Sequence, residues 1–266
     1  MAQVAVELGL PVWQPETVNA DEARAELRGA RADLLVVCDY GEILKRETLA
    51  VTRLGGINLH GSLLPKYRGA APVQWAVING ETETGNTVIQ MTAGLDAGPA
   101  LGVQRVPIDP DETAGELEAR LSEQGAEVLL SVVDALDAVT AQPRPQDKAA
   151  ASKAPRLEKE NGLIDWSRPA PAIKNQVRAL DPWPRAFTHW QRSGEPLRLI
   201  VHRVQATEDD NAGSAPGTIL QAGPRLLVAT NEGAIEILAV QPAGKRVMAA
   251  GELLRGYPLA QGQRLA

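Results

Sequence analysis

The strongest constraint on the fold is an alternation of short apolar segments with amphipathic ones in the first half of the chain. Strand-like runs bounded by Gly, Asp or Pro occupy residues 33–41, 55–60, 86–91 and 101–108. Residues 113–138 instead carry Leu and Val at helical spacing behind a polar start. This alternation predicts an α/β domain with a largely parallel sheet.

A different pattern follows in the second half. Residues 141–160 are rich in Pro, Ala and charge and show no period, which is typical of a linker. Beyond them, strand-like segments recur with turns about eight to twelve residues apart, as in a small antiparallel barrel of the OB-like kind. We therefore expect an α/β domain over residues 1–140, a linker over 141–160 and a β-barrel domain over 161–266.

Charge is distributed unevenly between these parts. Residues 1–150 carry 12 Lys and Arg against 22 Asp and Glu, whereas residues 151–266 carry 15 against 11. A basic module joined to an acidic one can hold a polyanion while the other half performs chemistry. Ordinary scatter of surface charge explains the same numbers, so composition alone leaves both interpretations open.

Several classes of protein are disfavoured by composition. One cysteine, Cys38, excludes an internal disulfide framework, and three scattered histidines predict no metal site. No apolar run approaches the roughly 20 residues that cross a bilayer, and the N-terminus lacks the features of a signal peptide. No G-x-G-x-x-G motif follows a strand, so we expect no dinucleotide cofactor. We expect a cytoplasmic protein that does not associate with membranes.

The candidate site lies where two of the expected strands end. Asn58 and His60 are two residues apart on a strand and therefore face the same side, beyond the carboxyl edge where open α/β sheets bind ligands. Asp96 follows the next strand in the turn GLDAG, and a carboxylate near an imidazole orients it and favours its protonated form. Such pairs and turns are more often structural than catalytic, so both interpretations stand on the residues alone.

Taken together, these residues match a known family. Residues 57–99 resemble the catalytic segment of the enzymes that use 10-formyltetrahydrofolate, and they read INLHGSLLPKYRGAAPVQWAVINGETETGNTVIQMTAGLDAGP. Nearly all 266 residues are similar to one branch of that superfamily, the methionyl-tRNA formyltransferases, and the ending VQPAGKRVMAAGELLRG is specific to that branch. The resemblance implies a Rossmann-like catalytic domain followed by a tRNA-binding barrel.

The resemblance also implies roles for particular residues. His60 would be the cationic donor and general acid, Asn58 a neutral donor to the formyl oxygen, and Asp96 the group that holds His60 protonated and accepts the proton of the attacking amine. The loop Ser62, Leu63, Leu64 and Pro65 corresponds to the tetrahydrofolate-binding segment of the family. The implied co-substrate is 10-formyltetrahydrofolate without a metal, and the implied partner is initiator methionyl-tRNA, with no obligate protein partner evident.

The start of the sequence departs from the family. The family carries a strand, helix and strand unit before the point where this sequence begins, and residues 4–10 look like the tail of a helix. We therefore expect an N-terminally truncated catalytic domain, and the activity of the shortened chain stays open. Lys245, Arg246 and Arg255 are candidate phosphate contacts, although a solvated basic surface explains them equally well.

Three alternatives remain at this point. The first is a related folate-dependent formyltransferase that acts on a sugar amine or on glycinamide ribonucleotide. The second is a formyltetrahydrofolate hydrolase with the same three polar residues. The third belongs to another class and is a non-catalytic protein that binds folate or tRNA.

Overall fold

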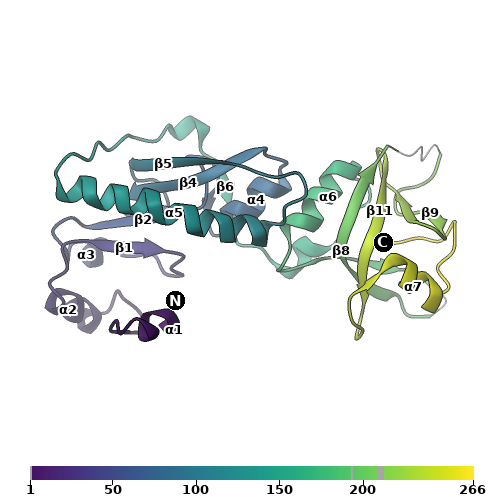
Figure 1. Cartoon of the computed structure of the whole chain (residues 1–266), viewed down its shortest axis with the longest axis horizontal. Helices are drawn as coiled ribbons and strands as arrows, with labels where there is room; N and C mark the ends of the chain where they lie inside the picture. Colours follow the sequence, from purple (N-terminus) through teal and green to yellow (C-terminus); the bar gives the residue numbers. More distant parts are fainter. Residues whose placement is uncertain (1, 193, 209–212) are drawn as a thin grey trace.

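The computed structural model describes residues 2–192, 194–208 and 213–266, which form two domains joined by a short helix. In Figure 1 the first domain lies on the left around one long helix, and the second lies on the right as a curved sheet with a small helix beside it. Within the described ranges, no helix combines the length and the apolar character that crossing a membrane requires.

The first domain contains a four-stranded sheet in the order β1-β2-β4-β5. β1 and β2 pair in parallel, while β2 with β4 and β4 with β5 pair antiparallel. The α/β class is confirmed, but the sheet is mixed rather than largely parallel. The short connection over 91–99 can only join antiparallel neighbours, which explains the pairing of β4 with β5, whereas the longer connection over 61–82 leaves the direction of β4 beside β2 open. The strands are β1 (Leu35–Cys38), β2 (Gly56–His60), β4 (Glu83–Gln90) and β5 (Ala100–Pro107).

The helix expected over 113–138 is the long helix α5 (Ala114–Asp137). Thr113 and Glu116 form a reciprocal capping box at its start, which satisfies backbone donors that would otherwise lack partners. Its apolar face, including Leu117 and Val132, is buried beside the sheet. The shorter helices of this domain are α1 (Ala2–Glu7), α2 (Asp21–Gly29), α3 (Arg46–Leu49) and α4 (Pro72–Ile78).

The segment over 141–160 lies against the first domain. β6 (Lys153–Ala154) pairs in parallel with β3 (Arg68–Gly69), with one 3-10 turn before it at Lys148–Ala150 and another after it at Lys159–Gly162. Gly69 has φ +129°, and a Cβ there would lie 2.4 Å from the carbonyl oxygen of Ala154. Only glycine tolerates both that φ and that close approach.

The second domain is a six-stranded antiparallel sheet whose main path runs β7-β8-β11-β10-β9, with β12 paired to β11. The C-terminal residues lie beside both ends of this path. The amide of Ala266 donates to the His189 carbonyl, and the amide of Leu265 donates to the Gly217 carbonyl. The tail thus lies between β7 and the start of β9. In the described residues β7 and β9 do not pair with each other, so the second domain is an antiparallel sheet and not the closed barrel that was expected. The elements are β7 (Ala186–Trp190), β8 (Leu197–Thr207), β9 (Ile219–Ala222), β10 (Leu226–Ala229), β11 (Ala234–Pro242), β12 (Met248–Ala249) and α7 (Ala250–Gly256).

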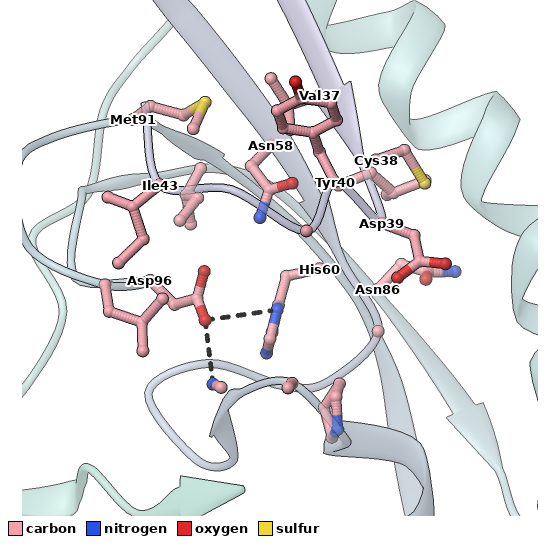
Figure 2. Close-up of a pocket in the computed structure, with 18 of the residues that line it drawn as sticks. Val37, Cys38, Asp39, Tyr40, Ile43, Asn58, His60, Asn86, Met91 and Asp96 are labelled. Atoms are coloured by element: carbon pink, nitrogen blue, oxygen red, sulfur yellow. Dashed lines mark hydrogen bonds and ion pairs between the residues drawn. The ribbon is translucent and has the colours of Figure 1, made fainter. Parts of the chain in front are cut away.

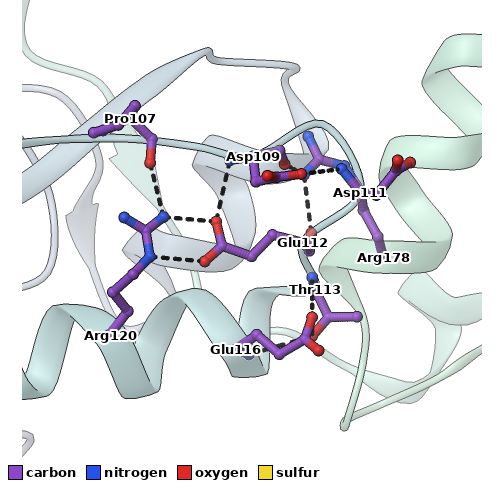
Figure 3. Close-up of polar contacts among 8 residues, drawn as sticks. All are labelled: Pro107, Asp109, Asp111, Glu112, Thr113, Glu116, Arg120 and Arg178. Carbon is purple, nitrogen blue, oxygen red and sulfur yellow. Dashed lines mark hydrogen bonds and ion pairs between the residues drawn. The ribbon is translucent and has the colours of Figure 1, made fainter.

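Helix α6 (Ala170–Ala179) joins the two domains. Its Ile173 and Val177 are buried in the core of the second domain, whereas Ala179 is buried with residues of α4 and α5. Arg178 from this helix donates to the backbone carbonyls of Asp109 and Glu112, each at 3.0 Å. Figure 3 shows this arginine against the loop that precedes α5. The helix therefore belongs to both cores and couples the two domains.

Candidate active site

A cavity of about 570 Å³ opens at the carboxyl end of β1 and β2. Its wall is built from the end of β1 and the loop after it, the end of β2, the loop before β5, and one side of α5. Asn58, His60 and Asp96 all line it, and Figure 2 shows the three side chains converging on the same space. The structure therefore brings together the three residues that the sequence singled out.

His60 ends β2 and is 6% exposed. Its Nε2 lies 2.9 Å from the backbone carbonyl oxygen of Tyr67, and its Nδ1 lies 3.7 Å from Oδ2 of Asp96. A carbonyl oxygen can only accept, so Nε2 is the donor in the first contact. The nitrogen that faces Asp96 is therefore Nδ1.

Asp96 is held by the backbone of the facing loop. The Gly69 amide donates to Oδ2 at 2.9 Å, as the second dashed line in Figure 2 marks. Asp96 itself has φ 47°, a left-handed conformation that Asp tolerates better than most residues. Two residues later, a Cβ on Gly98 would lie 1.7 Å from the carbonyl oxygen of Gln90, so the loop can pass β4 only with glycine there.

Asn58 points into the cavity from the same face of β2 as His60, as the two-residue spacing predicted. Among the residues that the structure describes, its side-chain amide has no hydrogen-bond partner within the protein. An amide in that position can donate two hydrogen bonds to a ligand and accept two from it.

The loop Ser62–Pro65 is placed differently from the three polar residues. The ends of the loop, Gly61 and Gly69, line the cavity, whereas residues 62–65 do not. Ser62 is fully buried, and its hydroxyl donates to the carbonyl of Lys66 at 2.7 Å. The Thr87 hydroxyl accepts from the Leu64 amide and donates to the Ser62 carbonyl. The loop is thereby tied to β4.

The cavity wall also contains residues that the sequence did not single out. Asp39 and Tyr40 follow β1, and Glu118 projects from α5. Desolvation raises the pKa of the Glu118 carboxyl; a hydrogen bond from Gln74 opposes that rise and the charge of Asp39 adds to it. Asp39 lies within residues 33–41, which were predicted as one strand-like run, so the end of β1 at Cys38 and the place of Asp39 after it were not evident from the sequence.

Comparison with known proteins decides the family. Residues 2–133 match the formyl transferase family and residues 156–258 match the formyl transferase C-terminal domain. A methionyl-tRNA formyltransferase from Roseiflexus castenholzii is 45% identical over 99% of this chain and 83% of its own length. The chain belongs to the methionyl-tRNA formyltransferase family. A second member, from Rhodopirellula baltica, is 46% identical over 97% of this chain and 79% of its own length.

Solved structures of formyltransferases share the fold at lower identity. The N-formyltransferase from Helicobacter canadensis, in complex with folinic acid and dTDP-3-aminofucose, superposes with a TM-score of 0.65 at 18% identity. The match covers 88% of this chain and 81% of that one. At this identity the likeness shows that the two proteins share a fold.

Proposed function

We propose that this chain transfers the formyl group of 10-formyltetrahydrofolate to the α-amino group of initiator methionyl-tRNA, which gives N-formylmethionyl-tRNA for translation initiation. The observation that carries the proposal is the convergence of Asn58, His60 and Asp96 on one cavity in a chain of this family. The folinic acid bound by the Helicobacter canadensis enzyme supports a folate as co-substrate.

The reaction needs no activated nucleophile on the protein. An α-amino group titrates near pH 8, about 7.7–8.0 in peptides, and the neighbouring ester lowers that value further. The amine nitrogen attacks the formyl carbon, and the carbonyl electrons move onto oxygen. When the tetrahedral intermediate collapses, the bond from carbon to N10 breaks, the folate nitrogen takes up a proton, and the former amine gives one up. The protein has to stabilise the oxyanion and move these protons.

The geometry supports Nδ1 of His60 as the nitrogen that exchanges its proton. Nε2 is committed to the Tyr67 carbonyl, whereas Nδ1 faces Asp96 in the cavity. His60 would donate from Nδ1 toward the formyl oxygen and the leaving nitrogen. Asp96 would stabilise the positive imidazolium and accept the proton that the amine sheds, directly or through water. Asn58 would donate to the same oxyanion from its amide.

The remaining parts of the site follow the family. The proposed folate-binding segment is Ser62, Leu63, Leu64 and Pro65. Its backbone hydrogen bonds to the Thr87 hydroxyl support the position of the adjoining Gly61 at the cavity wall. The net positive second half supports a role for the second domain over 161–266 in holding tRNA. We also propose that the reaction takes place in the cytoplasm, where translation initiation would use its product.

A formyl-transfer assay tests this function. The chain, and a version extended upstream, are each incubated with 10-formyltetrahydrofolate and methionyl-tRNA, free methionine or dTDP-linked amino sugars. We expect formyl to enter methionyl-tRNA and neither of the other acceptors. Transfer to an amino sugar, release of formate without an acceptor, or binding of folate and tRNA without turnover by either folded protein would each replace the proposal with one of the alternatives.

A further inference from the structure

Gln146 makes four hydrogen bonds that join the two loops on either side of His60. Its Nε2 donates to the backbone carbonyls of Asp96 at 2.8 Å and Gly98 at 2.7 Å. Its Oε1 accepts from Nε of Arg68 at 3.2 Å and from Nη2 of the same guanidinium at 2.6 Å. Two donors and two acceptor sites are the full capacity of an amide side chain, so every position is used.

The backbone on both sides of Gln146 is held in place. Arg144 and Ala100 exchange two backbone hydrogen bonds, each of 2.8 Å, which fixes the chain beside the start of β5. On the other side, Asp147 accepts from the Ala149 amide at 2.9 Å and begins a 3-10 turn. Gln146 therefore reaches the Asp96 loop from a segment that lies outside the sheet but is fixed against it.

We infer that Gln146 is a positioning residue for the proposed formyl transfer, which acts by holding the carboxylate of Asp96 opposite Nδ1 of His60. The inference rests on the proposed function for its chemistry and on the hydrogen bonds for its geometry. Asp96 accepts two hydrogen bonds that fix its position: its backbone carbonyl accepts from Nε2 of Gln146, and its Oδ2 accepts from the Gly69 amide. Arg68, the residue before Gly69, is bound to the same Gln146 amide. One side chain thus sets the distance between the loop that carries Asp96 and the loop that supplies its amide partner.

The residue itself does not contact the cavity, because Gln146 is absent from the wall that Asn58, His60 and Asp96 form. Its loss should therefore change the chemical step rather than substrate binding. Displacement of a reacting group by about 1 Å costs on the order of 10²-fold in rate, and loss of a supporting partner typically costs about 10- to 100-fold.

Gln146→Glu tests the two hydrogen bonds that Nε2 donates separately from the two that Oε1 accepts. A carboxylate keeps two acceptors for Arg68 but cannot donate, and it faces the carbonyls of Asp96 and Gly98 with a negative charge. Arg68→Ala does the reverse, because it leaves both contacts of Nε2 in place. Gln146→Ala removes the side chain without adding repulsion, and Gln142→Ala is the matched control in the same segment, at an exposed position.

The experiment measures kcat and KM for methionyl-tRNA formylation together with hydrogen exchange of the Gly69 amide, after circular dichroism has verified folding. We expect kcat to fall about 10- to 100-fold in Gln146→Glu and Gln146→Ala, with KM within about twofold of wild type. The Gly69 amide should exchange at least about tenfold faster in both. In Arg68→Ala, kcat should fall less than in the two Gln146 variants. In Gln142→Ala, kcat, KM and the exchange rate of the Gly69 amide should match wild type.

Unchanged kcat and unchanged Gly69 exchange in the two Gln146 variants would overturn the inference. So would a loss in Arg68→Ala that Gln146→Glu does not share, because Gln146 would then serve Arg68. A lower melting temperature together with similar changes in kcat and KM would also overturn it, because that result is expected of a contact that only stabilises the fold. If the wild-type chain forms no formylmethionyl-tRNA, the proposed function fails, while the Gly69 exchange data still decide whether Gln146 holds the Asp96 loop.

Discussion

The four-stranded sheet of the first domain ends in polar side chains around a cavity, whereas the antiparallel sheet of the second domain packs against an apolar core. β2 ends at His60 on the cavity wall, and Val36 on the neighbouring edge strand β1 is 50% exposed. In the second domain, Val228 and Ile235 on adjacent strands are fully buried, and the C-terminal tail forms backbone hydrogen bonds on both of its sides.

Chemistry can therefore take place at the strand ends of the first sheet, whereas the second domain gains its stability from its buried core. An open sheet leaves its strand ends available to a ligand, and loops from other elements can meet there. An antiparallel sheet that packs one face on an apolar core gains stability from the side chains buried there. Substitutions at the strand ends should therefore change turnover, while those in the core of the second domain should change the free energy of unfolding.

The largest expected effect is at the His60 and Asp96 pair. His60→Ala and Asp96→Ala should each lower kcat/KM about 10³-fold, because each removes a group that moves a proton or stabilises charge in the proposed transition state. Circular dichroism should match wild type, since neither residue belongs to an apolar core cluster. Near wild-type turnover in either variant would remove the pair from the mechanism.

A smaller effect is expected at Asn58. Asn58→Ala should lower kcat about 10²-fold, the loss typical of one oxyanion donor, and leave KM for the folate within a few-fold. Asn58→Asp is a useful partner variant, because it keeps the size of the side chain but replaces the donor with a negative charge. If Asn58→Asp were as active as wild type, the amide could not be donating to an oxyanion.

The same chemical change in the two sheets tests the contrast in stability. Val201 on β8 is 1% exposed, and Val103 on β5 is 52% exposed. Val201→Ala should lower the free energy of unfolding by about 2 kcal/mol, through lost apolar burial and a residual cavity. Val103→Ala should change it by less than about 0.5 kcal/mol. Urea unfolding followed by circular dichroism measures both, and equal costs at the two sites would contradict the burial argument.

Most of the fold was predictable because its signals are local. The period of α5 and its capping residues lie within one continuous segment, and each strand of the first sheet is a short apolar run between turn residues. Strand direction was not predictable in the same way. Whether β2 and β4 run parallel depends on how the chain crosses over between them, and the wrong expectation of a largely parallel sheet arose there.

The candidate site was predictable where spacing on one strand decides it. Asn58 and His60 share a face because side chains alternate along β2. The Tyr67 carbonyl that binds His60 and the Gln146 amide that binds the Asp96 loop carry no sequence motif. Gln146 is 50 residues from Asp96 in the sequence, inside a segment whose composition is typical of a linker. Only tertiary structure reveals contacts of this kind.

The smallest expected effect concerns the surface of the second domain. Lys245 and Arg246 are both exposed, but Arg246 forms an ion pair with Glu252. If this surface binds tRNA phosphates, Lys245→Gln should raise KM for methionyl-tRNA about fivefold, equivalent to about 1 kcal/mol. It should also reduce the slope of log affinity against log salt by about one, because one fewer counterion is released. Arg246→Gln should cost less, because its guanidinium already has a carboxylate partner. An unchanged salt slope in Lys245→Gln would mean that this surface is solvated and that tRNA binds elsewhere on the chain.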